Sequence, residues 1–284
     1  MRCLSNPERS PRDGGIAVTG VLRSLLALDD AGSGRFIGVS NGPAGKRAYG
    51  GHIAAQAFAA ACRTADAEMR PTSLHMQFLR AGDAATTTHY DVETVYDGRT
   101  SASRRVLAVQ EGRLLLVATA SFARPTEGPA HGRHSDTLGE PELLEATGPI
   151  GSAPSLPLDE IDIRIVDDWR TGEFVRRLWW RVTTELGDDP VLHACAAVYV
   201  TDIYGVDPIL RVHGHSMVDR SHRAATTDSS IWFHRPIRAD VWNLLESRSP
   251  AAARGRGVMT AHLFDGSGFT LATLVQEGMA VPRE

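Results

Sequence analysis

The chain has 284 residues, enough for two domains or one large core. Apolar residues make up 42% of it and the formal net charge is −4, without the basic excess typical of nucleic-acid binding, so no nucleic-acid partner is expected. The sequence lacks any apolar run near the roughly 18 residues of a membrane span, and its first residues lack a signal-peptide core. We therefore expect no membrane span and a cytoplasmic location.

The first half of the chain changes its periodicity from helix to strand. Residues 1–15 are expected to be a disordered N-terminus, and residues 16–125 a first domain. That domain begins with a short helix (Val18 to Leu28), a strand (Arg35 to Val39) and a long helix from Tyr49 that is apolar almost all round. Four strands with hairpin turns follow, at 72–79, 86–96, 100–109 and 113–122. A sheet wrapped around the long helix would bury that helix on every side.

The second half repeats this order after a linker. Residues 126–158, rich in Pro, Gly and Ser, are expected to be the linker, with one helical turn at PELLEA, and residues 159–284 a second domain. Its expected elements are two strands around a WRTGEF turn, a helix from Val191, and strands at 229–233, 241–246, 254–263 and 269–276. The segments VATASF and LATLVQ lie 154 positions apart (117 to 271), and HMQFLR and SIWFHR lie 155 apart (78 to 233). Two short matches at nearly one offset indicate an internal repeat, or pseudo-dimer.

The helix from Val191 begins and ends with notable residues. Asp189 is expected to cap it and Pro190 to take its first position. Asp202 is the only acidic residue of the run and lies near the helix C-terminus, where the helix dipole disfavours an anion. Taken alone, the segment favours a helix that ends at Thr201 with Asp202 in water. Cys3, Cys62 and Cys195 are expected to be reduced rather than disulfide-bonded or nucleophilic.

The chain resembles the type II (TesB-like) acyl-CoA thioesterases of the double-hotdog family from about Phe36 to Met279. The similarity lies in YGGHIAAQA, FLRAGD, YDVETVYDGRTSASRRV and ATASF, and later in TDIYG, TTDSSIWFHRP and TLVQEG. The resemblance implies an α+β double hotdog, two tandem repeats that each wrap a curved antiparallel sheet around a long helix. It also implies a homodimer or higher homo-oligomer, an acyl-CoA substrate and no cofactor.

The resemblance places a catalytic trio of Asp, Thr and Gln on Asp202, Thr226 and Gln276. Thr226 is chosen over its neighbour Thr227 by counting back from Trp232. In thioester hydrolysis, the Asp would orient or deprotonate a water that the Thr and Gln hold. The trio outweighs the ordinary interpretation of each residue alone, such as a turn cap or a solvent-facing strand residue.

Other residues are candidates for substrate contact or metal binding. Gly50 and Gly51 leave backbone N–H groups approachable at a helix start, and Arg220 and Arg223 are candidates for CoA phosphates, although a solvated basic loop is the commoner role of such arginines. Four histidines invite a zinc interpretation, but they lack a Cys or carboxylate at ligand spacing, so no metal is expected: His213, His215, His222 and His234.

Two alternative functions compete with hydrolysis. A double-hotdog enoyl-CoA hydratase would carry a D-x-N-P-[LIV]-H motif, but GVDPILRVH has Asp207 directly before Pro208 and Val212 in the place of the His. A non-catalytic acyl-CoA-binding module acting as a regulator would need an output element, and the sequence has no helix-turn-helix stretch. Hydrolysis is therefore the preferred prediction.

Overall fold

The computed structural model describes residues 20–135, 139–147, 159–170 and 173–284. The expected disordered N-terminus, residues 1–15, and part of the expected linker lie outside these ranges. In the described residues, no helix is both long and apolar enough to span a bilayer.

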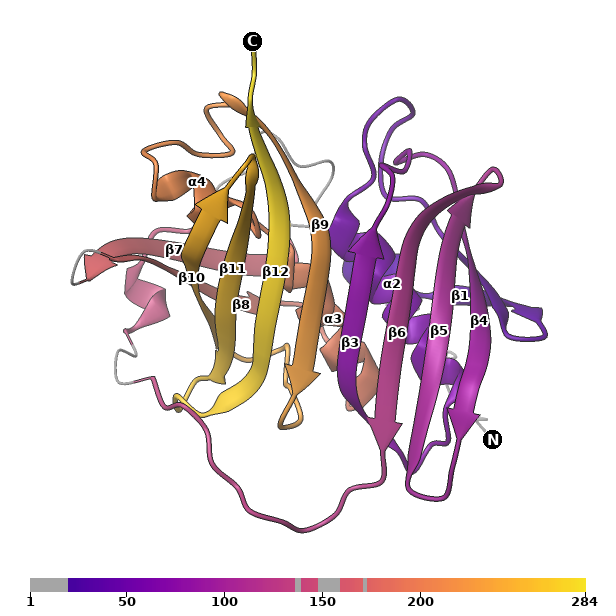
Figure 1. Ribbon diagram of the computed structural model, residues 1–284. Helices are drawn as coiled ribbons and strands as arrows, with labels where there is room; N and C mark the ends of the chain where they lie inside the picture. The colour runs from indigo at the N-terminus through magenta and orange to yellow at the C-terminus, as the bar shows by residue number, and fades with distance from the viewer. Residues whose placement is uncertain (1–19, 136–138, 148–158, 171–172) are drawn as a thin grey trace, which may run out of the picture.

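Twelve antiparallel strands of the described chain form one sheet (Figure 1), in the order β1-β2-β4-β5-β6-β3-β9-β12-β11-β10-β8-β7. The first half contributes β1 (Leu28–Gly32), β2 (Arg35–Gly38), β3 (Arg70–Phe78), β4 (Thr88–Asp97), β5 (Ser101–Gln110) and β6 (Arg113–Ala123). The second half contributes β7 (Ile161–Arg170), β8 (Glu173–Val182), β9 (His222–Phe233), β10 (Asn243–Ala253), β11 (Arg256–Asp265) and β12 (Thr270–Pro282). This order is symmetric about the β3–β9 pair. Outward from the centre, the first-half strands follow as β3, β6, β5, β4, β2 and β1, and their second-half counterparts as β9, β12, β11, β10, β8 and β7.

The two halves meet where β3 pairs with β9. His75 lies opposite Ser230 in this register, and its ring nitrogen Nδ1 lies 2.9 Å from the Ser230 hydroxyl. These residues are also equivalent in the repeat, 155 positions apart, so the pseudo-two-fold axis passes between them. Each half thereby covers one sheet edge of the other. This confirms the repeat and the double-hotdog fold.

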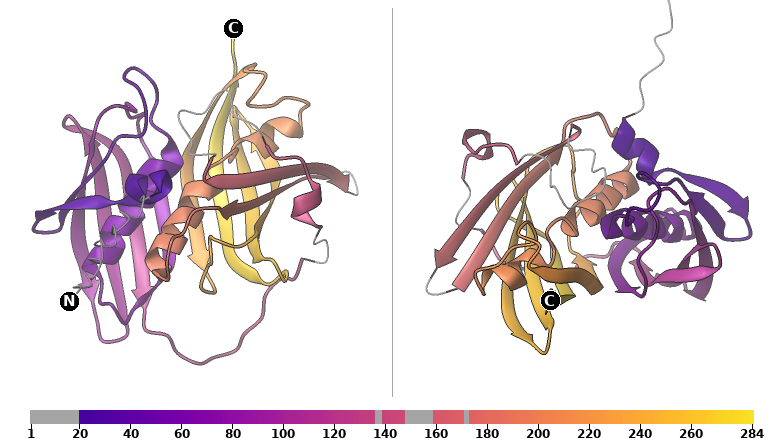
Figure 2. Two further views of the ribbon diagram at one scale, coloured as in Figure 1. Left: turned by 180° about the vertical axis from the view of Figure 1, so that it is seen from behind. Right: turned by 90° about the horizontal axis from the view of Figure 1, so that it is seen from above.

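Each half holds one long helix against its sheet. These helices are α2 (Gly50–Thr64) and α3 (Pro190–Thr201), and they lie side by side in Figure 2. As expected, Asp189 caps α3, its carboxylate accepting from the Val191 N–H at 2.9 Å. The Tyr49 hydroxyl, at the start of α2, donates to the Tyr199 carbonyl at 2.6 Å. That carbonyl belongs to the last turn of α3, where carbonyls lack a helical partner, so the bond ties the end of one helix to the start of the other.

Shorter helices and the linker complete the chain. They are α1 (Val21–Leu26), α4 (Asp207–Arg211) and one turn of 3₁₀ helix, η1 (Pro141–Leu143), where PELLEA predicted a turn. From Ala123 the chain crosses to the second half as an open arc (Figure 1). The Trp242 indole then donates to Glu142 at 2.6 Å, so the segment around η1 lies against the second half.

Several element boundaries differ from those predicted. The first helix is shorter than Val18–Leu28 because Ala27 is extended, and Leu28 begins an unpredicted strand, β1, that pairs with β2. Strand β9 begins at His222, seven residues before the expected start, and β12 continues past Gln276 to Pro282. Periodicity missed the start of β9 because its residues are mostly small and polar and carry no apolar alternation.

The close contact between the two helices depends on a residue without a side chain. A Cβ built on Gly51 would lie 2.5 Å from the Tyr199 carbonyl oxygen and 2.6 Å from the Tyr49 ring. We expect Gly51→Ala to lower the free energy of unfolding by about 2 kcal/mol, since a helix backbone and a buried ring cannot move aside cheaply. Denaturant unfolding measures this change. Gly128→Ala is the control, since Gly128 is exposed and has open space around it; equal stability of the two variants would contradict the prediction.

Candidate active site

Asp202 lies between the ends of two helices. It follows the last residue of α3 as its C-cap, with φ −88° and ψ −5°, and so continues the helical path for one residue. Its carboxylate faces the start of α2, where the Gly51 backbone N–H donates to it. A Cβ on Gly50 would lie 2.7 Å from Oδ2 of Asp202. The expected α3 end at Thr201 is confirmed, but Asp202 faces a protein pocket rather than open water.

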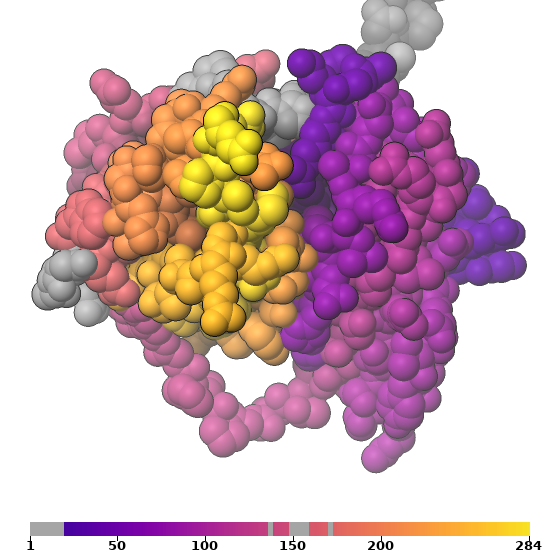
Figure 3. Space-filling view, turned by 45° about the horizontal axis from the view of Figure 1, so that its top comes forward, coloured from indigo at the N-terminus to yellow at the C-terminus, as the bar shows by residue number. Residues whose placement is uncertain are grey.

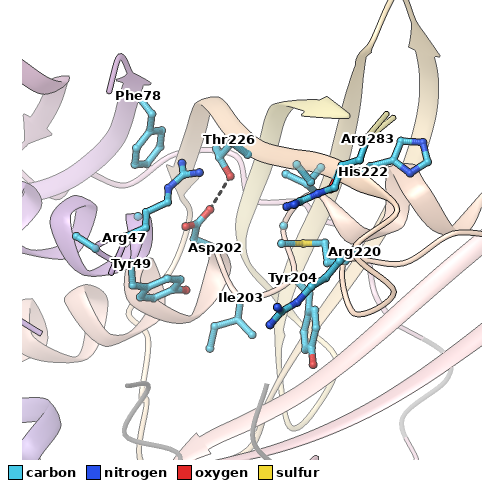
Figure 4. A pocket seen from close by; sticks show the side chains of 17 residues that line it. Arg47, Tyr49, Phe78, Asp202, Ile203, Tyr204, Arg220, His222, Thr226 and Arg283 are labelled. Atoms are coloured by element: carbon cyan, nitrogen blue, oxygen red, sulfur yellow. Dashed lines mark hydrogen bonds between the residues drawn. The ribbon is translucent and has the colours of Figure 1, made fainter. Parts of the chain in front are cut away.

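Thr226 and Gln276 complete a hydrogen-bonded chain with Asp202. The Thr226 hydroxyl donates to Oδ1 of Asp202 at 2.8 Å (Figure 4). The Gln276 amide nitrogen lies 2.6 Å from the Thr226 hydroxyl oxygen and 3.3 Å from Oδ1 of Asp202. Because the amide donates to the hydroxyl, the hydroxyl proton is directed at the carboxylate. Asp202 is thus held as an acceptor, which is the arrangement that favours its ionised form.

A β-bulge separates Thr226 from Thr227. Asp228 pairs with Glu277 and Thr226 with Gly278, so Thr227 is the extra residue on β9. Its hydroxyl donates to the Glu277 carboxylate at 2.7 Å and has no bond to Asp202. Bulges commonly redirect a side chain next to a functional site. The geometry therefore singles out Thr226 as the threonine that contacts Asp202.

The turn after α3 positions Gln276. The Gln276 amide packs so closely on Gly205 that a Cβ there would collide with it. Buried Arg176 steadies this turn through an ion pair of 2.6 Å with Asp207, and its guanidinium lies over the Tyr204 ring, 5.2 Å from the ring centroid. Gly205 thus provides room for the amide, and Arg176 holds the turn that carries Gly205.

The charge state of Asp202 reflects opposing effects. Burial of its carboxylate raises the pKa above the ordinary value. The hydrogen bond from Thr226, the positive charge of Arg47 and the hydrogen bond from Gln276 each lower it, and burial prevails. A carboxylate with a raised pKa is a stronger base than an ordinary one, so Asp202 is suited to accept a proton from water.

A pocket of about 420 Å³ opens beside the trio. Asp202 and Thr226 line it, together with Gly50, Tyr49 and Phe78 from the first half of the chain. In Figure 3 the surface is hollowed where the indigo and orange segments of the two halves meet. The site is therefore built by both hotdogs. Its basic lining residues are Arg47, Arg220, His222 and Arg283.

The other predicted substrate residues lie in different places. Gly50 and Arg220 line the pocket, whereas the Gly51 N–H is used by Asp202. Arg223 is exposed and does not line this pocket. The described residues contain no group of three or more His, Cys, Asp or Glu side chains arranged to hold a metal ion.

Several lining residues were absent from the sequence-based candidates, among them Arg47, Tyr49 and Arg283. Arg47 and Tyr49 lie within three residues before the Gly-Gly start of α2, so the approachable helix start was a signal that could have drawn attention to them. Arg283 is the next-to-last residue, and no local pattern marks it. Figure 4 shows Arg47 near Asp202, and Arg220 and Arg283 between Asp202 and His222.

Comparison with known proteins gives matches along most of the chain. Residues 39–123 match the family described as "Acyl-CoA thioesterase N-terminal domain", and residues 145–280 match "Acyl-CoA thioesterase C-terminal domain". Human acyl-coenzyme A thioesterase 8 is 32% identical over 288 residues, which covers 93% of this chain and 88% of the human protein. Acyl-CoA thioesterase 2 of Haemophilus influenzae is 29% identical, over 90% of this chain and 95% of that protein.

A solved structure agrees with these matches. The acyl-CoA thioesterase II TesB2 from Mycobacterium marinum superposes with a TM-score of 0.80 at 30% identity, covering 93% of this chain and 98% of the other. Both domain matches occur in the order of the two hotdogs, and the relatives are matched over nearly their whole length. The chain therefore belongs to the TesB-like acyl-CoA thioesterase II family.

Proposed function

We propose that this protein hydrolyses fatty acyl-CoA to a free fatty acid and CoA, with water activated by Asp202, Thr226 and Gln276. Family membership supports the reaction class. The observation that carries the residue assignment is the hydrogen-bonded chain from Gln276 through Thr226 to Asp202 on the wall of a pocket. The expected homo-oligomer and the cytoplasmic location stay predictions that follow from the resemblance and the composition.

The geometry suggests a role for each side chain. The Asp202 carboxylate takes a proton from water as the water oxygen attacks the thioester carbonyl carbon. The resulting tetrahedral intermediate collapses, the C–S bond breaks, and Asp202 returns the proton to the departing thiolate sulfur. The Thr226 hydroxyl donates its proton to Asp202 and accepts a hydrogen bond from the Gln276 amide. Its second lone pair is therefore available to accept a hydrogen bond from the water. Gln276 fixes this hydroxyl orientation.

The hydratase alternative gains no support from Asp207. Its carboxylate is buried, pairs with Arg176 and accepts the Met217 N–H at 2.6 Å. It is absent from the pocket lining. Asp207 therefore has a structural role, and Asp202 is the carboxylate that faces the pocket.

Asp202→Asn tests the proposed base. An amide cannot accept the proton from water, so we expect kcat to fall by about 10²–10⁴-fold, equivalent to roughly 3–5 kcal/mol. The measurement is release of CoA thiol from saturated acyl-CoA of increasing chain length. Asp91→Asn, on the exposed face of β4, is the control and should match the wild type. Unchanged turnover in Asp202→Asn would refute the assignment, and binding of acyl-CoA without turnover in the wild type would favour the non-catalytic alternative.

The pH dependence of hydrolysis should report the protonation state of Asp202. Asp202 must be ionised to act as a base, and burial raises its pKa. The acidic limb of kcat/KM should therefore lie above the ordinary aspartate pKa of about 4, with activity lost as pH falls through the raised value. Thr226→Val removes a hydrogen bond to the ionised form, so it should move this limb to higher pH. A limb that stays in place in Thr226→Val would contradict the coupling.

The bulge in β9 predicts different effects for adjacent threonines. Thr226→Val removes the hydroxyl that contacts Asp202 and should lower kcat by about 10–10²-fold. Thr227→Val removes a contact to Glu277 on the other side and should leave kcat within about twofold. Each variant is the matched control for the other. Equal losses of activity would show that the bulge does not divide their roles.

A further inference from the structure

A second cavity of about 240 Å³ lies next to the catalytic pocket. Buried Ile209 and Leu210 of α4 line it, together with Ala252, Ala253 and Ala280. His222 lines both cavities, at the start of β9. The catalytic pocket is therefore continued, beyond His222, by a space with apolar and small-residue walls.

The second cavity also has a basic rim, formed by His213, His222, Arg254 and Arg256. Arg256 forms an ion pair of 2.8 Å with Glu277, whereas the side chains of Arg254 and His213 form no hydrogen bond or ion pair with any described residue. Arg254 lies in the β10–β11 turn, where Gly255 has a φ of +72°. Its guanidinium is thus presented at the cavity without a carboxylate from the described part of the chain to neutralise it.

The two cavities together form a strongly cationic surface on an acidic chain. Arg47, Arg220 and Arg283 line the first cavity, and in Figure 4 Arg220 and Arg283 lie between Asp202 and His222. Among the described lining residues of both cavities, Asp202 is the one carboxylate. The formal net charge of the chain is −4. Such a cluster of positively charged side chains complements a ligand that carries several phosphates.

We propose that the second cavity receives the 3′-phosphorylated adenosine end of the coenzyme A group. The apolar floor and the alanines accommodate the base, and Arg254 with His213 contacts the phosphate. The pantetheine arm then passes His222 and reaches Asp202 through the first cavity. This inference rests on the proposed acyl-CoA hydrolysis, because it assigns the nucleotide end of that substrate.

The repeat provides a matched control for Arg254. Arg99 lies 155 positions earlier, in the β4–β5 turn that corresponds to the β10–β11 turn. Arg99 is also exposed, but it lines neither of the two cavities. Arg99→Gln and Arg254→Gln therefore make the same chemical change in equivalent turns.

The first test compares two substrates with the same acyl group. One is the acyl-CoA, and the other is the N-acetylcysteamine thioester, which lacks the nucleotide. Arg254→Gln should raise KM for the acyl-CoA about tenfold with kcat unchanged, and should leave kcat/KM for the short thioester as in the wild type. Arg99→Gln should match the wild type on both. Equal losses on both substrates, or no loss on either, would overturn the inference.

A second test needs no hydrolysis. Isothermal titration calorimetry with adenosine 3′,5′-bisphosphate should detect binding to the wild type and to Arg99→Gln, and weaker binding to Arg254→Gln and His213→Gln. If the wild type hydrolyses the short thioester but does not bind the bisphosphate, the inference fails while the proposed reaction stands. If hydrolysis is absent but the bisphosphate binds and depends on Arg254, the proposed reaction fails while the nucleotide site stands.

Discussion

The site depends on one electrostatic arrangement, a carboxylate placed between the end of one helix and the start of another. At the C-terminus of its own helix, Asp202 meets the negative end of the helix dipole, which is unfavourable. Within the second hotdog, the hydrogen bonds from Thr226 and Gln276 compensate for part of this cost. The first hotdog adds to this compensation, because the positive end of α2 and the Gly51 N–H face the same carboxylate. The antiparallel pairing of α2 and α3 therefore stabilises the Asp202 carboxylate as well as the packing of the two helices.

The sequence predicted the architecture well and the candidate site in part. Apolar α2 and α3, the hairpin turns and the repeat all follow from local patterns, and the resemblance named Asp202, Thr226 and Gln276, whose side chains lie in contact in the structure. Arg47 and Arg283 were missed because they lie in a loop and at the chain end, and only the tertiary fold brings them to the pocket. The bulge that separates Thr226 from Thr227 was also beyond prediction, since it depends on the register between β9 and β12.

The pseudo-two-fold axis relates the Asp202 site to an equivalent position in the first half, and that position carries different side chains. Cys62 lies twelve residues after the start of α2, as Asp202 lies twelve after the start of α3, and Asp189 is near enough to raise the pKa of the Cys62 thiol in addition to burial. Pro71 stands at the position equivalent to Thr226, and Ala120 at that of Gln276, because Leu74 pairs with Ala120 as Ser229 pairs with Gln276. A protonated thiol, a proline and an alanine cannot together orient and deprotonate water. Only one of the two equivalent positions has the side chains for the proposed chemistry.

The junction of β3 with β9 within a single chain explains how such asymmetry can exist. In a dimer of identical subunits every substitution appears at both equivalent places, so a change that suits one place is imposed on the other. Covalent fusion removes this coupling. One position is then free to become apolar support, while the segments around the other carry arginines, as Arg47, Arg220 and Arg283 do at the pocket. The fused chain thereby separates selection for stability from selection for catalysis, residue by residue.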